Sequence, residues 1–365
     1  MQYYNLKKIL SKKAHYNIIF GERSNGKTYA CLEYALKNFI ENGEQFAYLR
    51  RMKEDIVGKR ASTIFNALVE NNVVSKLTKG EYTTIYYNSG AYYLANYDEK
   101  LQKIIPNQNK CIGYIFSLTD MEHNKSTSYP LVTTIIFDEF LTRQYYLTDE
   151  FVLFMNTIST IVRQRNNVKI FMLGNTVNKY CPYFKELGLK HVEKMKQGDI
   201  DLYTYGESEL RVAVEYTPST DRKNKKSNLY FAFDNPKLNM IKSGSWEMAM
   251  YPHCPYKYKK SDIVLTYFII FEGNTLQCEI VQTDNVFFTY IHEKTTPLQN
   301  DNNDIIYSLE YSPKFNYSRN ILKPVTKAQK RIVWFFSTDN VFYQDNEVGE
   351  IVRNYIQACK TNKLV

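Results

Sequence analysis

The sequence lacks several features that would place the protein in a membrane or outside the cell. No run of about 20 apolar residues occurs, so no membrane-spanning helix is expected. The first residues, MQYYNLKK, have none of the apolar core of a signal peptide. The six cysteines form no CxxC pair and have no histidine at metal-ligand spacing, which argues against a zinc site. These absences predict free thiols in a reducing cytoplasm and no contact with membranes.

The composition is that of a folded protein with an excess of positive charge. Hydrophobic residues make up 44% of the 365 positions and charged residues 23%, which excludes a wholly disordered chain and allows two domains. The formal net charge of +9 favours contact with a polyanion, although a well-solvated surface explains the surplus equally well. The 32 tyrosines suit interface surfaces, because their rings pack while their hydroxyls stay hydrated.

The first 200 residues or so alternate short apolar runs with longer helix-like stretches. We expect strands over residues 16–20, 45–50, 112–118, 132–137 and 168–173, a hairpin over 82–95, and helices over 28–40, 56–70 and 150–162. This alternation predicts an α/β domain with a mainly parallel sheet.

The character of the chain changes beyond this point. Residues 217–227 are polar and basic and predict an exposed linker. From residue 262 the pattern predicts three strands, 263–271, 275–282 and 286–291, followed by helices over 326–336 and 347–360. We therefore predict a first domain of residues 1–200, a linker region of residues 201–260 and a small α+β domain of residues 261–365.

One glycine-rich motif carries a specific chemistry. It consists of Gly21, Glu22, Arg23, Ser24, Asn25, Gly26, Lys27 and Thr28, and it matches the P-loop spacing GxxxxGK[ST] between a predicted strand and a predicted helix. Gly21 and Gly26 let successive backbone N–H groups face a phosphate, and the helix N-terminus adds to this anion site. Lys27 would neutralise the β- and γ-phosphates, and Thr28 would hold Mg²⁺. The motif predicts that the cofactors are ATP and Mg²⁺.

A second signature lies at the end of another predicted strand. The apolar run TTIIF is followed by Asp138 and Glu139, the form of a Walker B motif. Asp138 would bind Mg²⁺ through its water shell, and Glu139 would act as the general base that polarises the attacking water. The alternative is that the two acids cap a following helix. Together with the P-loop, the pair indicates an ATPase.

Two further positions are candidates for the same site. Asn175 follows the strand predicted at 168–173, where a polar side chain can sense the γ-phosphate, although asparagine is equally common as a turn residue. Arg163 and Arg165 follow the helix predicted at 150–162. In a ring of subunits such an arginine can reach a neighbour's nucleotide, and the alternative is a solvated helix end.

Taken together, these residues resemble the DNA-packaging ATPases of phi29-like bacteriophages, within the additional-strand, catalytic-glutamate class of P-loop motors. The resemblance covers most of residues 15–185. Its most telling parts are residues 20–29, 43–53, 125–130, 136–140, 162–165, 173–175 and 182–184.

This resemblance implies a motor that pumps double-stranded viral DNA into a preformed prohead. The active form would be a homo-oligomer, a pentameric ring docked on the portal protein, in the host cell cytoplasm and transiently at the portal vertex. A family relative binds a structural packaging RNA, and the basic, aromatic-rich C-terminal region makes such an RNA a candidate partner here.

The resemblance also assigns roles to individual basic residues. Arg163 falls where the family's trans-acting arginine lies, and Lys125 matches a lysine that acts across the subunit interface. Arg50, Arg51 and Lys53 lie where the family presents basic residues to DNA, which suits phosphate contacts that grip without reading sequence. The alternative for these three residues is a plain basic strand end.

The C-terminal part resembles an RNase H-type nuclease domain that has lost its metal site. An active nuclease needs several carboxylates converging on two metal ions. The available acids are Asp262, Glu272, Glu279 and Asp284, which turns and exposed strand faces explain equally well. Two competing functions therefore stay open: a terminase large subunit with an active nuclease, and a helicase-type ATPase that remodels nucleic acid. The absence of helicase motifs beyond the nucleotide site counts against the latter.

Overall fold

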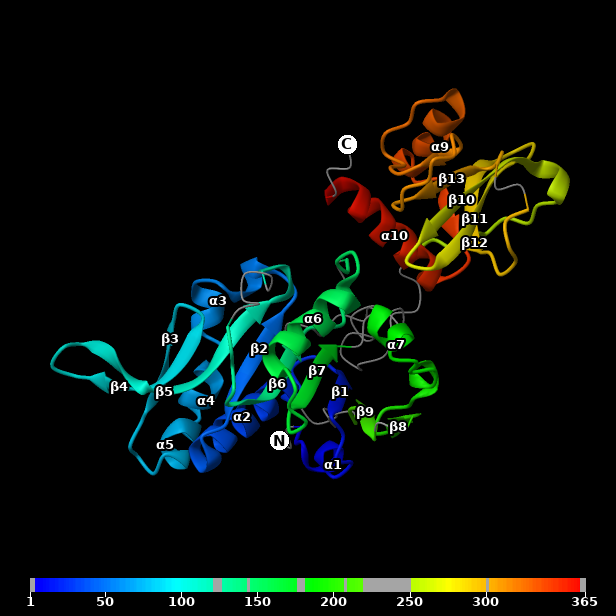
Figure 1. The fold of residues 1–365 in the computed structure, drawn as a ribbon. Coiled ribbons are helices and arrows are strands. Elements are labelled where there is room, and N and C mark those ends of the chain that lie inside the picture. Colours follow the sequence, from blue (N-terminus) through cyan, green and yellow to red (C-terminus); the bar gives the residue numbers. More distant parts are fainter. Residues whose placement is uncertain are drawn as a thin grey trace, which may run out of the picture. The chain divides into compact units, whose positions relative to one another are not determined.

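The computed structural model describes residues 4–120, 127–142, 145–175, 181–206, 209–218, 251–299 and 302–361. The chain divides into two compact units, the first built mainly from described residues up to 218 and the second mainly from residues 251–361. Each unit contains one mixed sheet with helices packed against it, so the α/β class expected from the sequence is confirmed (Figure 1). Among the described residues, no helix is both long and apolar enough to cross a bilayer.

The first unit is organised around a nine-stranded sheet with the order β3-β4-β5-β2-β6-β7-β1-β9-β8. The strands are β1 (Tyr16–Gly21), β2 (Gln45–Arg50), β3 (Thr84–Asn88), β4 (Ala91–Asp98), β5 (Lys103–Ser117), β6 (Val132–Asp138), β7 (Lys169–Asn175), β8 (Ile200–Tyr205) and β9 (Leu210–Tyr216). The six strands from β5 to β9 in this order pair in parallel, and the outer strands β3, β4 and β8 pair antiparallel. The mainly parallel sheet predicted for this part is therefore present.

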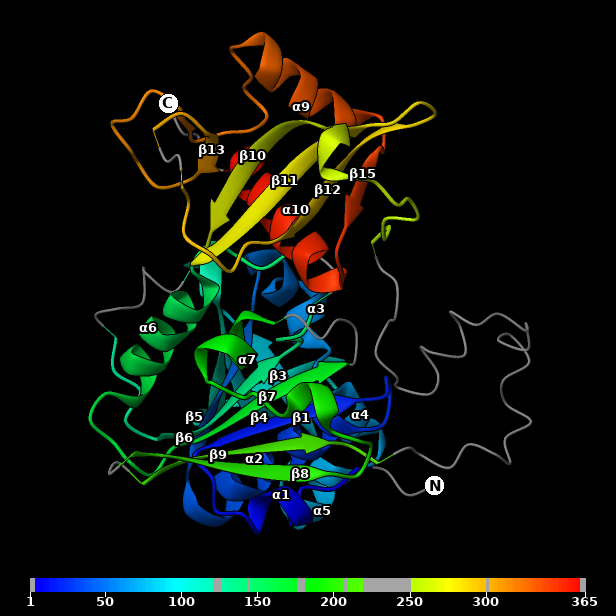
Figure 2. The same cartoon turned by 90° about the vertical axis from the view of Figure 1, so that its right-hand side faces the viewer.

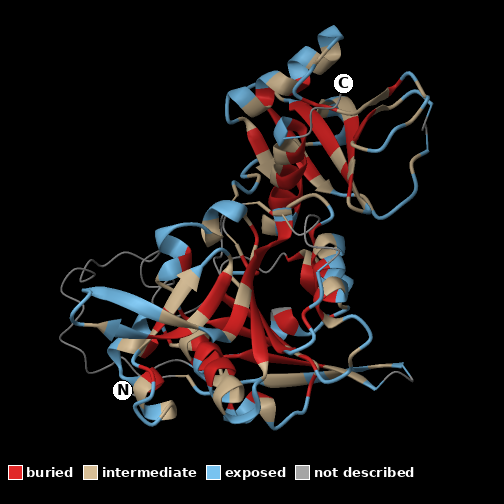
Figure 3. Cartoon of the chain, turned by 60° about the vertical axis from the view of Figure 1, so that its left-hand side comes forward, coloured by how far each residue is buried: buried red, intermediate tan, exposed pale blue. Residues whose placement is uncertain are grey.

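The central strands are buried because helices cover both faces of the sheet. β1 is buried at every position, as expected for an apolar run in a parallel sheet. Figure 3 shows that the central strands of the sheet are largely buried. Helix α2 (Lys27–Asn42) contacts β2, β6 and β7, while α6 (Glu150–Val162) contacts β6 and α7 (Pro182–Glu186) (Figure 2). The remaining α-helices of this unit are α1 (Lys7–Leu10), α3 (Lys59–Ser62), α4 (Asn66–Glu70) and α5 (Val73–Leu77).

Two predictions for the first unit differ from the structure. The helix expected over residues 56–70 is divided into α3 and α4, because the Thr63 hydroxyl bonds the Lys59 carbonyl and competes with a continuous helix. Residues of the predicted linker region instead form most of β8 and all of β9, and β9 pairs in parallel with β1. The strand that carries the P-loop therefore has sheet partners on both sides.

The second unit has a six-stranded sheet with the order β14-β13-β10-β11-β12-β15. Its elements are β10 (Ile263–Phe271), β11 (Asn274–Gln282), β12 (Phe287–Glu293), β13 (Ile305–Ser308), β14 (Tyr317–Ser318), α9 (Lys327–Ser337), β15 (Val341–Tyr343) and α10 (Asn346–Thr361). The three long strands and both helices were predicted from the sequence and are confirmed. The amphipathic α10 buries one face against β10, β12 and β15 (Figure 2).

Candidate active site

A pocket of about 230 Å³ lies where β1, β6 and β7 end and α2 begins. Ligands of open parallel sheets bind at this edge, beyond the carboxyl ends of the strands. The pocket is lined by Ser24, Asn25, Gly26, Lys27, Thr28, Tyr29, Asp138, Glu139, Gly174 and Asn175. The structure thus brings the P-loop, the two acids and the predicted sensor around one cavity.

The backbone of the P-loop needs its two glycines. Gly26 is the N-cap of α2 and has φ +95°, a left-handed conformation that costs glycine least. A Cβ atom at Gly21 would lie 1.9 Å from the Thr217 hydroxyl oxygen, so no larger residue fits there. Within the loop, Glu22 and Asn25 are buried while Arg23 and Ser24 are exposed. The loop is therefore anchored at both ends and open at its middle.

The Lys27 ammonium group is held by three oxygen acceptors. It donates to the Glu22 carbonyl oxygen at 2.6 Å, to Asn25 Oδ1 at 3.2 Å and to Asn175 Oδ1 at 3.3 Å. Burial lowers the pKa of Lys27 to about 8, and the nearby carboxylates of Asp138 and Glu22 only partly offset this effect. A buried cation of this kind gains strongly from an anionic ligand such as a phosphate.

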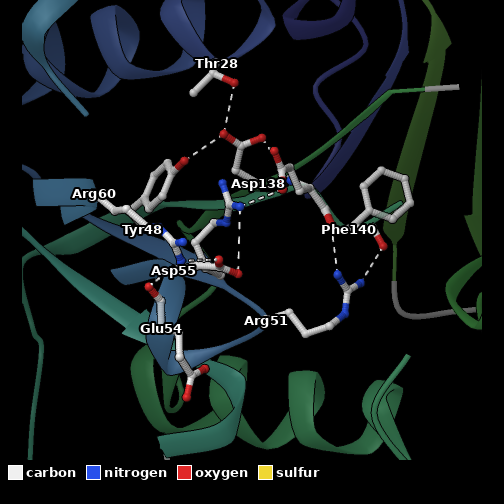
Figure 4. Close-up of polar contacts among 10 residues, drawn as sticks. Thr28, Tyr48, Arg51, Glu54, Asp55, Arg60, Asp138 and Phe140 are labelled. Carbon is white, nitrogen blue, oxygen red and sulfur yellow. Dashed lines mark hydrogen bonds and ion pairs between the residues drawn. The ribbon is translucent and has the colours of Figure 1, made fainter. Parts of the chain in front are cut away.

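The oxygens of Thr28 and Asp138 face each other across the pocket. Thr28 donates its hydroxyl to Asp138 Oδ2 at 3.0 Å, and the Tyr48 hydroxyl donates to the same oxygen at 2.7 Å (Figure 4). Mg²⁺ prefers hard oxygen ligands and is commonly held by one carboxylate, a hydroxyl, waters and phosphate. The pair formed by Thr28 and Asp138 fits this ion.

Glu139 lies beside Asp138 at the end of β6 and reaches a different partner. Its φ of +59° is unusual for a residue with a side chain, and its main-chain N–H donates to Asp138 Oδ1 at 2.9 Å. The Glu139 side chain is 56% exposed and forms an ion pair of 2.6 Å with Arg50 from the end of β2. The two adjacent acids therefore have distinct surroundings, one inside the pocket and one at its edge.

Arg51 is buried, which corrects the DNA contact predicted for it. Its guanidinium pairs with the Glu150 carboxylate at 2.6 Å. It also donates to the Phe140 carbonyl oxygen at 2.8 Å (Figure 4). Glu150 has no exposed side-chain area and also accepts from the Tyr183 hydroxyl at 2.8 Å. Arg51 thus ties the turn after the two acids to α6. Lys53, in contrast, is 57% exposed and pairs with Asp120 at 3.1 Å.

The two arginines after α6 have different surroundings. Arg165 donates to the carbonyl oxygens of Tyr129, Pro130 and Val132, so it holds the loop before β6 in place. Arg163 is exposed, and its guanidinium donates to the Thr127 carbonyl oxygen at 3.1 Å. Arg163 is not among the described residues that line the pocket of its own chain. Lys125 lies outside the described residues.

Two residues at the site were missed from the sequence. Tyr48 lies inside a predicted strand, and its contact with Asp138 depends on the register in which β2 pairs with β6. Thr217 follows β9 and accepts a hydrogen bond from the Asn25 amide at 2.9 Å. No motif signals either contact, because both partners are distant in sequence.

The carboxylates of the second unit do not gather into one site. Within the described ranges, no group of three or more His, Cys, Asp or Glu side chains could hold a metal ion. Glu279 instead accepts hydrogen bonds from Tyr258 at 2.7 Å and Gln277 at 2.6 Å, and it lies 3.5 Å from His292. Hydrogen bonds and the His292 charge hold the pKa of Glu279 below its usual value despite burial.

Known proteins share both sequence and fold with this chain. It is 31% identical over 186 residues to the DNA packaging protein of Bacillus phage phi29, covering 50% of this chain and 49% of that one. It is 30% identical over 177 residues to the DNA packaging protein of Bacillus phage B103, covering 47% and 48%. The chain spans about half the length of the curated relatives it matches.

Two solved structures extend the likeness in fold to the whole chain. The phi29 viral genome packaging motor assembly superposes with a TM-score of 0.59 at 19% identity, covering 98% of this chain and 100% of that one. The phi28 gp11 DNA packaging motor gives 0.58 at 18%, covering 100% and 99%. The family described as podovirus DNA encapsidation protein (Gp16) matches residues 1–88 and 73–302. The chain belongs to this family of podovirus DNA encapsidation proteins.

Proposed function

We propose that this protein is an ATP-hydrolysing motor subunit that translocates double-stranded viral DNA into a prohead through the portal. The observation that carries the proposal is the pocket in which Lys27, Thr28, Asp138 and Glu139 converge. Lys27 supplies a buried cation for phosphate, and Glu139 supplies a carboxylate in reach of the same cavity. Membership of the encapsidation family supports DNA as the cargo.

Hydrolysis follows from the chemistry of these side chains. The P-loop backbone and Lys27 bind the β- and γ-phosphates of ATP. Glu139 orients a water molecule and accepts its proton as the water oxygen bonds to the γ-phosphorus. The bond between the γ-phosphorus and the oxygen that bridges to the β-phosphate breaks in the same step, which releases ADP. Thr28 and Asp138 would hold Mg²⁺, which neutralises charge on the phosphates when bound. Asn175 Oδ1 accepts a hydrogen bond from Lys27 Nζ, which supports a role for Asn175 in reporting the γ-phosphate.

Residues outside the pocket would complete the site in a ring. Arg163 is exposed and carries a guanidinium that suits the phosphates of a neighbouring subunit's nucleotide. Lys125 is proposed to act across the same interface. A homopentamer of this kind would dock on the portal protein in the host cytoplasm, with a structural packaging RNA as a further candidate partner.

DNA would be gripped by Arg50 at the end of β2 and by Lys53 in the turn that follows. Lys53 is exposed, and Arg50 lies at the pocket edge on Glu139. A phosphate that competes for Arg50 would release Glu139, which would link DNA contact to hydrolysis. We assign Arg51 to positioning rather than to DNA, since its guanidinium is buried on Glu150.

The second unit is proposed to be an RNase H-like domain without nuclease activity. Its long antiparallel strands and closing helix are compatible with that fold, and the described residues hold no cluster of three metal-binding side chains. We propose an ATPase domain that extends beyond residue 200 to the end of β9 at residue 216, because β9 pairs with β1, followed by a linker region up to residue 260 and a C-terminal domain, residues 261–365.

One assay series tests the motor function. Purified protein is incubated with ATP and Mg²⁺, with and without linear duplex DNA, and phosphate release is followed, with Lys27→Ala as the inactive control. We expect release that DNA stimulates and that the Lys27 substitution abolishes. Phosphate release equal in the control, or none under any condition, would overturn the ATPase proposal. Nicking of plasmid by the same protein in Mn²⁺ would instead favour a terminase with an active nuclease.

A further inference from the structure

Thr217 joins the end of β9 to the P-loop through its side chain. Its hydroxyl oxygen accepts a hydrogen bond from the Asn25 amide nitrogen at 2.9 Å, between residues 192 positions apart. Its main-chain N–H donates to the Phe20 carbonyl oxygen at 2.8 Å, which fixes Thr217 beside the end of β1. The residue is 0% exposed, so this hydroxyl bonds the loop and not solvent.

The Asn25 side chain connects Thr217 to Lys27. Asn25 Oδ1 lies 3.3 Å from the Lys27 main-chain nitrogen and 3.2 Å from Nζ. An amide has donors on its nitrogen and acceptors on its oxygen, so a hydrogen bond that holds the nitrogen also determines where the oxygen points. Asn25 is 2% exposed, which keeps water from replacing the Thr217 hydroxyl. Thr217 therefore selects the orientation in which Asn25 supports Lys27.

Tyr4 links the same strand end to Asn25 by a second route. Its main-chain N–H donates to the Asn25 carbonyl oxygen at 3.0 Å, and its hydroxyl donates to Glu215 Oε2 at 2.6 Å. Glu215 precedes Thr217 by two positions at the end of β9, and both residues are buried. Burial raises the pKa of the Tyr4 hydroxyl, which keeps it protonated as a donor. The end of β9 thus holds Asn25 by both its side chain and its main chain.

We infer that Thr217 is a positioning residue for ATP binding, which orients the Asn25 amide so that it holds the Lys27 ammonium toward the phosphates; this inference rests on the proposed ATPase function. Thr217 is not among the described residues that line the pocket, whereas Asn25 is. Thr217 therefore acts through Asn25. Its loss misplaces a binding group without removing the general base. The effect therefore falls on the Kd and KM for ATP more than on kcat.

The test compares substitutions that differ by one hydroxyl group. Thr217→Ser keeps the hydroxyl and Thr217→Ala removes it, with the β-methyl absent from both. The Kd is measured in the full-length protein with a fluorescent ATP analogue, alongside KM, kcat and the melting temperature. Thr157→Ala is the matched control, because Thr157 is also fully buried in the first unit but its hydroxyl bonds the Leu153 carbonyl oxygen of its own helix.

We expect Thr217→Ala to weaken ATP binding roughly three- to tenfold relative to Thr217→Ser, the size of one lost hydrogen bond, with kcat within about twofold. Equal Kd values in the two variants, or a fall in kcat at unchanged KM, would overturn the inference. If Thr217→Ala does not fold, Thr217→Val replaces it, since valine keeps the shape of threonine and lacks only the hydroxyl. Failure of the wild-type protein to bind ATP would instead reject the proposed function, and this inference with it.

Discussion

Arg50 Nη2 lies 2.6 Å from Glu139 Oε2, so the proposed general base is held in an ion pair at the edge of its own pocket. Asp55 Oδ2 lies 3.9 Å from the same nitrogen and offers Arg50 a second partner. This ion pair fixes the direction of the Glu139 carboxylate and competes with any contact that the carboxylate makes to a water in the pocket.

Arg50→Ala should therefore raise ATP hydrolysis in the absence of DNA. The pair is partly exposed, with side chains 19% and 56% accessible, so we expect only a two- to fivefold increase, about the strength of a screened ion pair. Steady-state phosphate release measures it. Arg60→Ala is the control, because Arg60 contacts Asp55 and the Glu54 carbonyl oxygen. A decrease in hydrolysis would show that Arg50 helps the reaction instead.

Glu139→Gln should separate ATP binding from hydrolysis. Glutamine keeps the shape of the side chain but accepts no proton at neutral pH, so turnover should fall by roughly two to four orders of magnitude. Lys27, Thr28 and Asp138 are untouched, and the Kd for ATP should stay within about twofold of the wild-type value. Equilibrium binding measures the Kd for ATP, and single-turnover hydrolysis measures the loss of catalysis. Unchanged turnover would remove Glu139 from its role.

Arg163→Ala should abolish ATP hydrolysis in the assembled ring, and mixing with Glu139→Gln subunits should restore part of it. A ring that contains both Arg163→Ala and Glu139→Gln subunits has some interfaces with an intact glutamate on one side and an intact arginine on the other. Titrating one variant into the other should therefore restore part of the phosphate release. Absence of activity at every ratio would argue that Arg163 acts within its own subunit or not at all.

ATP binding should take up a proton near pH 8.5. Burial lowers the pKa of Lys27 to about 8, so most of this lysine is neutral at pH 8.5, and bound phosphates favour its charged form. About three quarters of a proton should be absorbed per site if the pKa rises well above 9 in the complex. The affinity should accordingly fall as the pH rises through 8. Calorimetry in two buffers of different ionisation enthalpy measures the uptake, and equal heats would contradict it.

Arg51→Met should destabilise the first unit. The substitution leaves the Glu150 carboxylate buried without its cation, which costs about 3–5 kcal/mol in free energy of unfolding. The double variant Arg51→Met, Glu150→Gln should recover part of the loss. Urea unfolding followed by circular dichroism measures both. Lys53→Met is the control, since an exposed ion pair contributes about 1 kcal/mol or less.

Much of the first unit was predictable because its central strands are fully buried. Buried parallel strands appear in sequence as continuous apolar runs, and β1, β2 and β6 were located to within a residue or two. The P-loop was identified by its spacing between a predicted strand and a predicted helix, and Asp138 and Glu139 by the apolar run that precedes them. β8 was missed because its positions are half-buried or exposed, so no apolar run signals it.

The side-chain contacts between distant residues that shape the site could not be predicted from the sequence. The contact of Tyr48 with Asp138 and that of Arg50 with Glu139 arise only when β2 and β6 lie side by side, with Tyr48 opposite Ile136. The burial of Arg51 depends on Glu150 of α6 in the same manner. The amino-acid sequence shows which residues are polar, but tertiary packing determines which partner each polar group contacts.

The strand order has a consequence for how the protein is made. β1 pairs with β7 and β9, so Tyr16 lies opposite Ile170 on one side and Val212 on the other. At translation rates of about 5–20 residues per second, a ribosome needs on the order of 10 to 40 s to supply the second partner. Throughout that interval the apolar β1 lacks at least one of its two partner strands. Nascent chains of this protein should therefore depend on chaperones until residue 216 has left the exit tunnel.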